Sequence, residues 1–133
     1  IFGAFVSGMD AGKIYNTWPL MGDDFFPNDS DVVSLFSISM FSDPSLVQFL
    51  HRNLAYLIFL FYLIILFKSY LYKNLEYFKI LKIIGFLLTT QIVLGIFTLL
   101  SGAQIIVASM HQISSIFLLS SSIFFLYLNT RTS

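Results

Sequence analysis

The chain has 133 residues, of which 57% are hydrophobic and 11% are charged, and its mean hydropathy is +0.85. Soluble domains contain about 25% charged residues, so this composition excludes a water-soluble globular domain and predicts an integral membrane protein. The net charge is zero and the chain has no cysteine, which argues against a nucleic-acid partner and excludes disulfides, thiolate metal sites and cysteine nucleophiles.

The first segment, residues 1–9, is apolar and rich in small residues. It begins without methionine and without the basic flank of a signal peptide. Gly3, Ser7 and Gly8 would form a small-residue face, which lets membrane helices pack closely. We interpret the segment as the last two turns of a spanning helix that is cut at residue 1, and we expect the chain to be part of a longer protein.

Residues 10–43 form a polar segment that holds all of the aspartates, two of the three prolines and the only tryptophan. Proline disfavours helix in the residue before it, so no helix is expected across Trp18-Pro19 or Phe26-Pro27. The aromatic residues of the segment are typical of a membrane interface. We expect a folded flap with a short interfacial helix near residues 31–41. The aspartates lack the spacing of a calcium loop and are interpreted as a solvated acidic face.

Three spanning helices follow, predicted over residues 44–68, 80–100 and 103–128. Asp43 suits the N-cap of the first of them and Pro44 its first helical position. About 20 apolar residues cross a bilayer, so the uncharged run between Lys82 and Arg131 fits two spans rather than one. Ser101-Gly102 is the predicted turn between them.

The loop at 69–79 and its flanks carry the lysines Lys68, Lys73, Lys79 and Lys82. Basic loops remain on the cytoplasmic or matrix side, so this inner loop places residues 10–43 on the outer side. The predicted fold is an all-α membrane protein, a four-helix transmembrane bundle whose first helix is truncated.

Two of these helices carry stripes of small or polar residues at helical spacing, which predict faces that pack against protein rather than lipid. The third helix has Gln91, Gly95, Thr98 and Gly102, and the fourth has Ala108, His111, Ser115 and Ser122.

The chain has two histidines, His51 and His111, and both lie in apolar runs. Ionisable side chains at membrane depth mark functional sites. Both lie about 10–12 Å from the outer ends of their helices, at 1.5 Å per residue. Equal depth suits a planar group held by two axial imidazoles, as in haem proteins. A structural histidine pair and a zinc site remain alternatives, although zinc normally takes three or four protein ligands.

Four blocks of the sequence carry a family resemblance. They are G-A-F-V-S-G-M-D-A-G-K-I-Y-N-T-W-P-L-M-G at 3–22, L-V-Q-F-L-H-R-N-L-A-Y at 46–56, Q-I-V-L-G-I-F-T-L at 91–99, and M-H-Q at 110–112. With these blocks the whole chain resembles the haem A synthase family. Its members have eight spanning helices in two similar halves, and this chain resembles the C-terminal half, from the end of helix five to helix eight. Some bacterial members of the family have cysteine pairs in their loops, whereas this chain has no cysteine. In this respect the chain resembles the mitochondrial and alphaproteobacterial branch.

The resemblance implies an oxidoreductase that converts a methyl group of haem O to the formyl group of haem A for cytochrome c oxidase. It implies a haem b cofactor whose iron is bound by His51 and His111. The substrate haem and the catalytic carboxylate are expected in the N-terminal half. Expected partners are haem O, that half, membrane lipid, haem O synthase and an electron donor. The expected location is a bacterial cell membrane or the mitochondrial inner membrane.

Three further residues are candidates for the cofactor site. Gln48 and Gln112 are candidate partners for the second ring nitrogen of each histidine, or else ordinary interhelical hydrogen bonders. Arg52 is expected at the outer rim, where it would pair with a haem propionate or extend to the interface. Two other functions remain open: a cytochrome b-type electron carrier, and a membrane assembly protein without cofactor.

Overall fold

The computed structural model describes residues 2–73 and 75–131, and its elements are helices. The α-helices are α1 (Phe2–Gly8), α2 (Pro44–Leu71), α3 (Leu75–Leu100) and α4 (Ile105–Arg131). Three short 3-10 helices, η1 (Ala11–Lys13), η2 (Val32–Phe36) and η3 (Ile38–Ser42), lie in the loop between α1 and α2. Over the described ranges the only β pairing is an isolated bridge between Met21 and Asp24, so the all-α prediction is confirmed.

Three of the helices are long and apolar enough to cross a membrane: Pro44–Leu71, Tyr77–Leu100 and Ile105–Thr130. Many of their large apolar side chains are exposed, among them Phe86, Ile106 and Leu126. A helix satisfies its backbone hydrogen bonds internally, and its exposed apolar side chains can face lipid. Such helices are therefore suited to a bilayer. The predicted membrane bundle of helices is therefore confirmed, with α1 as its short fourth helix.

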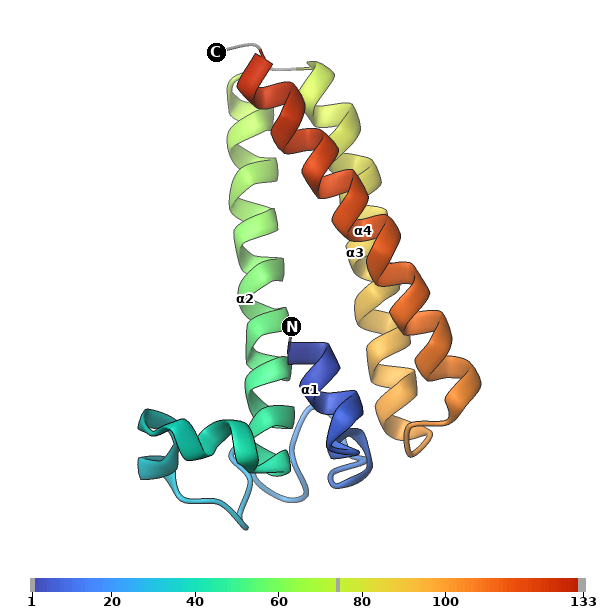
Figure 1. Ribbon diagram of the computed structural model, residues 1–133. Helices are drawn as coiled ribbons and strands as arrows, with labels where there is room; N and C mark the ends of the chain where they lie inside the picture. Colours follow the sequence, from blue (N-terminus) through green and yellow to red (C-terminus); the bar gives the residue numbers. More distant parts are fainter. Residues whose placement is uncertain (1, 74, 132–133) are drawn as a thin grey trace.

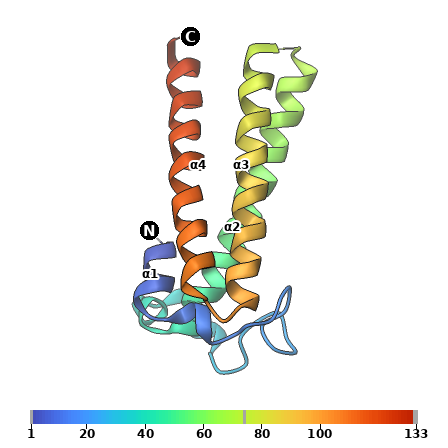
Figure 2. The ribbon, with the colours of Figure 1, turned by 90° about the vertical axis from the view of Figure 1, so that its right-hand side faces the viewer.

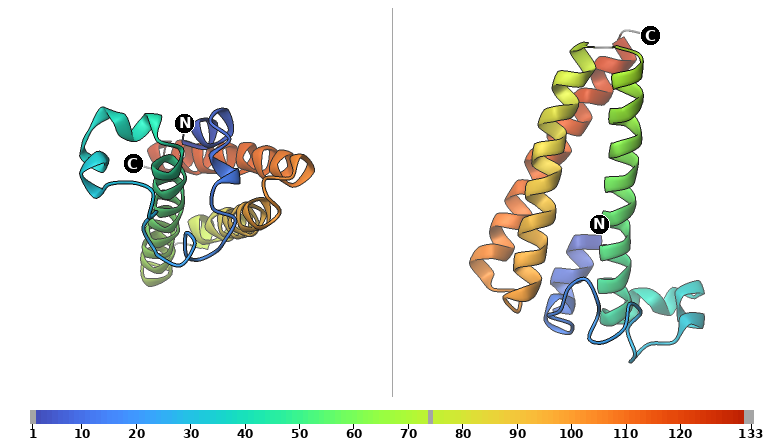
Figure 3. Two further views of the ribbon diagram at one scale, coloured as in Figure 1. Left: turned by 90° about the horizontal axis from the view of Figure 1, so that it is seen from below. Right: turned by 180° about the vertical axis from the view of Figure 1, so that it is seen from behind.

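The helices form an open V (Figure 1). α3 and α4 pack against each other and are joined by the turn at their lower end in Figure 2. α2 approaches the pair near the connection between Leu71 and Leu75 and diverges from it toward the other end (Figure 1). α1 lies in this wider end, beside α2 and between it and the α3–α4 pair (Figures 1 and 3). The wider end is the one that was predicted to face outward.

The described helix bounds differ from the predicted ones at the lysine-rich end. α2 continues to Leu71 and α3 begins at Leu75, so the predicted loop 69–79 shortens to the connection between them. Lysine is a good helix former and its long side chain reaches the interface from within a helix. The lysines therefore mark where the helices leave the apolar layer and not where the helices end. Lys73, with φ 51°, adopts the left-handed conformation just beyond α2.

The turn between α3 and α4 lies at Ser101-Gly102, as the sequence predicted. Gly102 has φ 68° and Ala103 has φ 59°, and the amide of Ala103 donates to the carbonyl of Thr98 at 2.8 Å. The residues that follow α3 thus adopt the left-handed backbone conformation, which glycine adopts readily and which commonly ends an α-helix. Ala103 was predicted to begin the last helix, but its positive φ belongs to the turn and α4 begins at Ile105.

The N-terminal end of α2 is capped and closely packed. The carboxylate of Asp43 accepts the amides of Ser45 and Leu46 at 2.9 and 3.3 Å, and Pro44 occupies the first turn. This is the predicted N-cap. The next turns contribute most of the buried residues of α2, namely Ser45, Leu46, Val47, Gln48 and Arg52.

The expected interfacial helix near 31–41 is replaced by two 3-10 turns. Ser37 separates η2 from η3 with an extended backbone (φ −122°, ψ 161°). Its hydroxyl bonds the carbonyl of Ser34 at 3.2 Å, and such local serine bonds compete with α-helix. Phe36 and Ile38 are each 88% exposed. The two turns project from α2 on the side away from α3 and α4 (Figure 3).

The lysines predict which end of the bundle faces the inside of the membrane, and cysteine labelling tests this orientation. We expect a cysteine replacing Tyr72, which is 81% exposed, to be protected from a membrane-impermeant thiol reagent added outside. A cysteine replacing the exposed Ser39 should react, because the positive-inside rule predicts that the basic connection is inside and residue 39 lies at the other end of α2. Labelling of intact cells, with lysed cells as the control, measures both. The opposite pattern would reverse the orientation.

Candidate functional site

The two histidines lie close to each other across the wider end of the V. His51 is seven residues into α2, which begins at Pro44, and His111 is six residues into α4, which begins at Ile105. At 1.5 Å per residue their depths are about 10 and 9 Å. The ring centroids are 6.4 Å apart and the ring planes are inclined by 85°. Helices distant in sequence thus bring the two imidazoles together.

This separation can be compared with that of two imidazoles bound to one metal ion. A metal–imidazole bond is about 2.0 Å long, and each ring centre lies about 1 Å beyond its bonded nitrogen. Two imidazoles on opposite sides of one metal ion would therefore have centroids about 6 Å apart. The 6.4 Å separation of His51 and His111 fits that arrangement.

His111 is held by α3. Its Nδ1 lies 3.1 Å from the backbone carbonyl oxygen of Gln91. The ring can approach the α3 backbone because residue 95 is glycine: a Cβ there would lie 3.0 Å from Cε1 of His111. The side-chain amide of Gln91 also contacts both ring nitrogens, at 3.1 and 3.2 Å.

His51 is held more loosely. Its ring is half-buried and lies against α1, where a Cβ at Gly3 would be 3.8 Å from Cε1 of His51. Among the residues that the structure describes, no side-chain hydrogen bond of His51 is found. The small-residue face of α1 thus packs beside this histidine, and the two histidines have unequal surroundings.

Gln48 does not contact a histidine. It is 2% exposed, and its amide nitrogen donates to the carbonyl of Tyr15 at 3.1 Å. Its orientation follows from the loop that folds over the end of α2, which sequence spacing could not reveal. Gln112 is exposed on α4, and no described bond joins its side chain to His111. Gln91, and not Gln112, contacts the His111 ring, and its place on the polar stripe of the third helix was the available signal.

Arg52 is buried, with 9% exposure, and does not lie at an open rim. Its Nη1 donates to the carbonyls of Thr17 and Leu20 at 3.0 and 3.1 Å, and its Nη2 to that of Tyr15 at 3.0 Å. The loop covers the arginine because these carbonyls have no partners within a helix or sheet and need donors. The pairing of Arg52 with a propionate stays a prediction.

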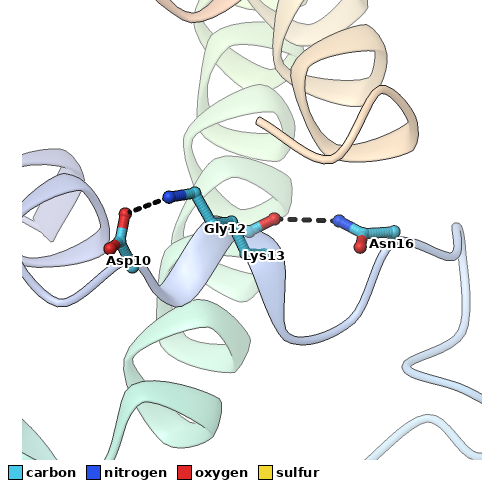
Figure 4. Close-up of polar contacts among 4 residues, drawn as sticks. All are labelled: Asp10, Gly12, Lys13 and Asn16. Atoms are coloured by element: carbon cyan, nitrogen blue, oxygen red, sulfur yellow. Dashed lines mark hydrogen bonds and ion pairs between the residues drawn. The ribbon is translucent and has the colours of Figure 1, made fainter. Parts of the chain in front are cut away.

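Further bonds hold the loop in place. The Tyr15 hydroxyl donates to Asp29 at 2.7 Å, and the Ser45 hydroxyl of α2 donates to the other oxygen of Asp29 at 2.8 Å. Asn16 bonds the carbonyls of Gly12 at 3.0 Å and of Leu99 in α3 at 2.9 Å. Figure 4 shows the first of these Asn16 bonds beside the Asp10–Lys13 ion pair of 2.8 Å. The loop therefore connects α2 to α3.

An apolar cleft lies further along the helices that carry the histidines, and neither histidine lines it. Its volume is about 400 Å³ and it lies between α2, α3 and α4. Ile58 is two helical turns inward of His51, and Ser115 is one turn inward of His111. The cleft is lined by residues such as Ile58, Phe61, Ile84, Leu88, Ser115 and Leu118. Such a cleft suits the apolar part of a flat ligand.

The side chains available as metal ligands also bear on the alternative of a zinc site. Within residues 2–73 and 75–131, no three histidine, aspartate or glutamate side chains gather at one place. Zinc normally takes three or four protein ligands, whereas haem iron takes one or two. The residues present therefore fit a haem better than a zinc ion.

Comparison with known proteins supports the same family. The model of the family described as "Cytochrome oxidase assembly protein" matches residues 1–123. The protein named "Heme A synthase" from Pelagibacter ubique (strain HTCC1062) is 47% identical over 132 residues. The chain belongs to the haem A synthase family of cytochrome oxidase assembly proteins. No solved structure matches the chain.

Two other relatives named "Heme A synthase" support the assignment to the haem A synthase family. They come from Wolbachia pipientis wMel, 40% identical over 134 residues, and Rickettsia prowazekii (strain Madrid E), 38% identical over 130 residues. The three alignments cover 96–100% of this chain but only 37–39% of the relatives. The chain therefore spans less than two fifths of their length. That it corresponds to the C-terminal half stays a prediction.

The arginine contact predicts a specific effect on the loop. Replacing Arg52 by Lys keeps the charge but removes the planar guanidinium group, whose two Nη atoms donate to three carbonyls. Losing one hydrogen bond to a charged group should raise amide exchange of residues 15–20 by about tenfold or more. Hydrogen exchange with mass spectrometry measures this, with Lys68→Arg at the other end of α2 as the control. Unchanged exchange in Arg52→Lys would contradict the role of Arg52.

The Asp29 contacts predict a response to acid. Burial raises the pKa of the Asp29 carboxyl, but hydrogen bonds from Tyr15 and Ser45 outweigh it and lower the pKa below 3.8. The carboxylate thus stabilises the loop above pH 3.8, and this stabilisation is lost as the pH falls through the lower folded-state pKa. Burial, and then the bond to Asp29, raises the pKa of Tyr15 above 10.0, so its phenol stays a donor throughout.

Fluorescence of Trp18, the only tryptophan, reports on this loop during acid titration. We expect its emission to change below pH 3.8 in the unmodified chain. In Asp29→Asn that step should be missing, because the titrating group is gone. An identical step in both proteins would assign the transition to another carboxyl group.

Proposed function

We propose that this chain is part of a haem A synthase and that it binds haem b between His51 and His111. The whole enzyme would convert a methyl group of haem O to the formyl group of haem A for cytochrome c oxidase. The observation that carries the proposal is the 6.4 Å separation of the two imidazoles, from two different helices at equal depth. Family membership supports the reaction, because the relatives are named for it.

The chain's own residues would hold the cofactor as follows. The carbonyl of Gln91 accepts from Nδ1 of His111, which leaves Nε2 of His111 as the ligating atom. His51 would supply the second ligand from α2. The cleft between α2, α3 and α4 would take the apolar edge of the ring, and the loop held by Arg52 would close the outer side. When bound, a bis-imidazole haem supplies one-electron transfer.

The reacting substrate would bind elsewhere in the enzyme. The three candidate spans contain no aspartate or glutamate, and the two histidines are both assigned to haem b. Removing hydrogen from a methyl group needs a group placed to take up a proton. We therefore assign the haem O site and its carboxylate to the N-terminal half. Haem O synthase and an electron donor are proposed as further partners.

Ligand replacement tests the cofactor assignment. We expect His51→Leu and His111→Leu each to lose most bound haem or to change its absorption from low-spin to high-spin, because one axial ligand is missing. Met110→Leu, next to His111 but exposed, should keep the low-spin spectrum. Visible absorption of the purified proteins measures this. Unchanged low-spin spectra in both histidine variants would exclude the assignment, and a haem-free unmodified chain would favour a cofactor-free assembly protein.

Product analysis tests whether the haem O site lies outside this chain. The chain by itself, given haem O and a reductant, should bind haem and yield no haem A, because it lacks a second haem site and a carboxylate in its spans. Chromatography of extracted haems measures the product. Haem A made by this chain alone would place the substrate site here. No haem A from the complete protein would favour a cytochrome b-type electron carrier.

A further inference from the structure

The end of α2 that leads into α3 lies opposite the histidines (Figure 1), and its surface carries a groove of about 430 Å³. Residues four apart form the ridges of a helix surface, and grooves run between neighbouring ridges. At 1.5 Å per residue this groove follows α2 for about 14 Å. It is lined by two rows of side chains from α2, with Leu63, Phe67 and Leu71 in one row and Ile64, Lys68 and Tyr72 in the other.

The chemistry of the groove changes along its length. Leu63 and Ile64 lie toward the middle of the span, whereas Tyr72 follows its last residue, Leu71. Lys68 is exposed, and a lysine near the end of a spanning helix extends its ammonium group to the interface. Tyrosine is favoured at the same depth. The groove therefore passes from hydrocarbon to a cation and a phenol hydroxyl, as a phospholipid passes from its acyl chain to its phosphate.

The positive charge at this end exceeds the negative charge. Residues 68–82 hold four lysines and one acidic residue, Glu76. Among the side chains that the structure describes, the ion pair found is the one between Asp10 and Lys13, at the other end of the bundle. Lys68 and Lys73 therefore keep charges that attract an anion.

The backbone at the end of α2 opposes an anion only weakly. The C-terminus of a helix carries a partial negative charge of about half a unit. The amide of Tyr72 donates to the carbonyl of Lys68 at 3.0 Å, and the amide of Lys73 to that of Tyr70 at 3.2 Å, so two of these carbonyls are already used. The two full positive charges of Lys68 and Lys73 exceed what remains.

We propose that this groove is a binding site for an anionic phospholipid. One acyl chain would lie between the two ridges, with the phosphate beside Lys68 and Lys73, and the Tyr72 hydroxyl would donate to a phosphate oxygen. A lipid without net charge gains less from the lysines, because its own cationic group offsets the phosphate. The site does not depend on the proposed haem site, which lies toward the other end of α2.

Quenching of tryptophan fluorescence by brominated lipids tests the site in the whole chain, reconstituted in phosphatidylcholine vesicles. Trp18→Phe removes the only native tryptophan, and Phe67→Trp places a reporter in the groove. Brominated phosphatidylglycerol should bind at this reporter more tightly than brominated phosphatidylcholine. We expect a ratio of binding constants of about fivefold or more, since one lysine near anionic lipid contributes a factor of about five.

Further variants distinguish a site from general surface charge. Lys68→Gln should lower the ratio by about fivefold, whereas Lys68→Arg keeps the charge and should keep the ratio. Lys82→Gln is the matched control. It removes the same charge at the same end, but from α3, where the ammonium group lies 5.1 Å from the centroid of the Phe78 ring, and it should leave the ratio unchanged. A reporter at Phe124→Trp, exposed on α4, should show nearly equal binding of the two lipids.

Three results would overturn the proposal. The first is equal binding of the two lipids at Phe67→Trp in the otherwise unmodified chain. The second is an equal loss in Lys68→Gln and Lys82→Gln, because the preference would then reflect net charge alone. The third is weak quenching of the Phe67→Trp reporter by both lipids, which would mean that protein and not lipid covers the groove.

Discussion

The structure depends on a buried guanidinium near the N-terminal end of α2. Arg52 donates to the carbonyls of Tyr15, Thr17 and Leu20, and Gln48, one turn earlier, donates again to Tyr15. Burying a charged group is costly unless its donors are hydrogen-bonded. The irregular loop supplies acceptors that no helix or sheet uses. These carbonyls pair with both Nη atoms of Arg52, although its Nε and Oε1 of Gln48 are buried without a hydrogen bond to a described residue, and the loop is thereby folded over α2 instead of extending into water.

This contact also explains where the histidines lie. His51 precedes Arg52, so fixing the arginine toward the loop side of α2 fixes the rotation of the helix and points His51 elsewhere on its circumference. α1, which the same loop holds beside α2, brings Gly3 against the His51 ring. On the other side of the site, Asn16 ties the loop to the carbonyl of Leu99, close to the turn that leads into α4. One loop thus contacts α2, which carries His51, and the end of α3 that leads into the turn before α4.

The two sides of the site are built differently. α3 and α4 pack closely, and Gln91, Gly95 and Ser114 surround His111 with a backbone acceptor, open space and a polar side chain. α2 diverges from that pair at the outer end (Figure 1), and His51 faces the wider space with one small residue of α1 beside it. In the proposed haem site, a firmly held imidazole would face a more adaptable one, which would suit the entry of a large flat cofactor because only one side has to adjust.

The amino-acid sequence by itself determined the membrane class, the three long helices, the cap at Asp43 and the turn at Ser101-Gly102. These follow from local chemistry: apolar length, a carboxylate before a proline, and a glycine that accepts positive φ. It also predicted, from equal depth, that His51 and His111 form one site, and their rings do lie together. The tertiary structure alone decided which polar residues serve that site. Helix rotation and the path of residues 10–43 assigned Arg52 and Gln48 to the loop, left Gln112 exposed and brought Gln91 to His111. Those choices depend on contacts between segments up to 83 residues apart, and such contacts have no signature in local spacing.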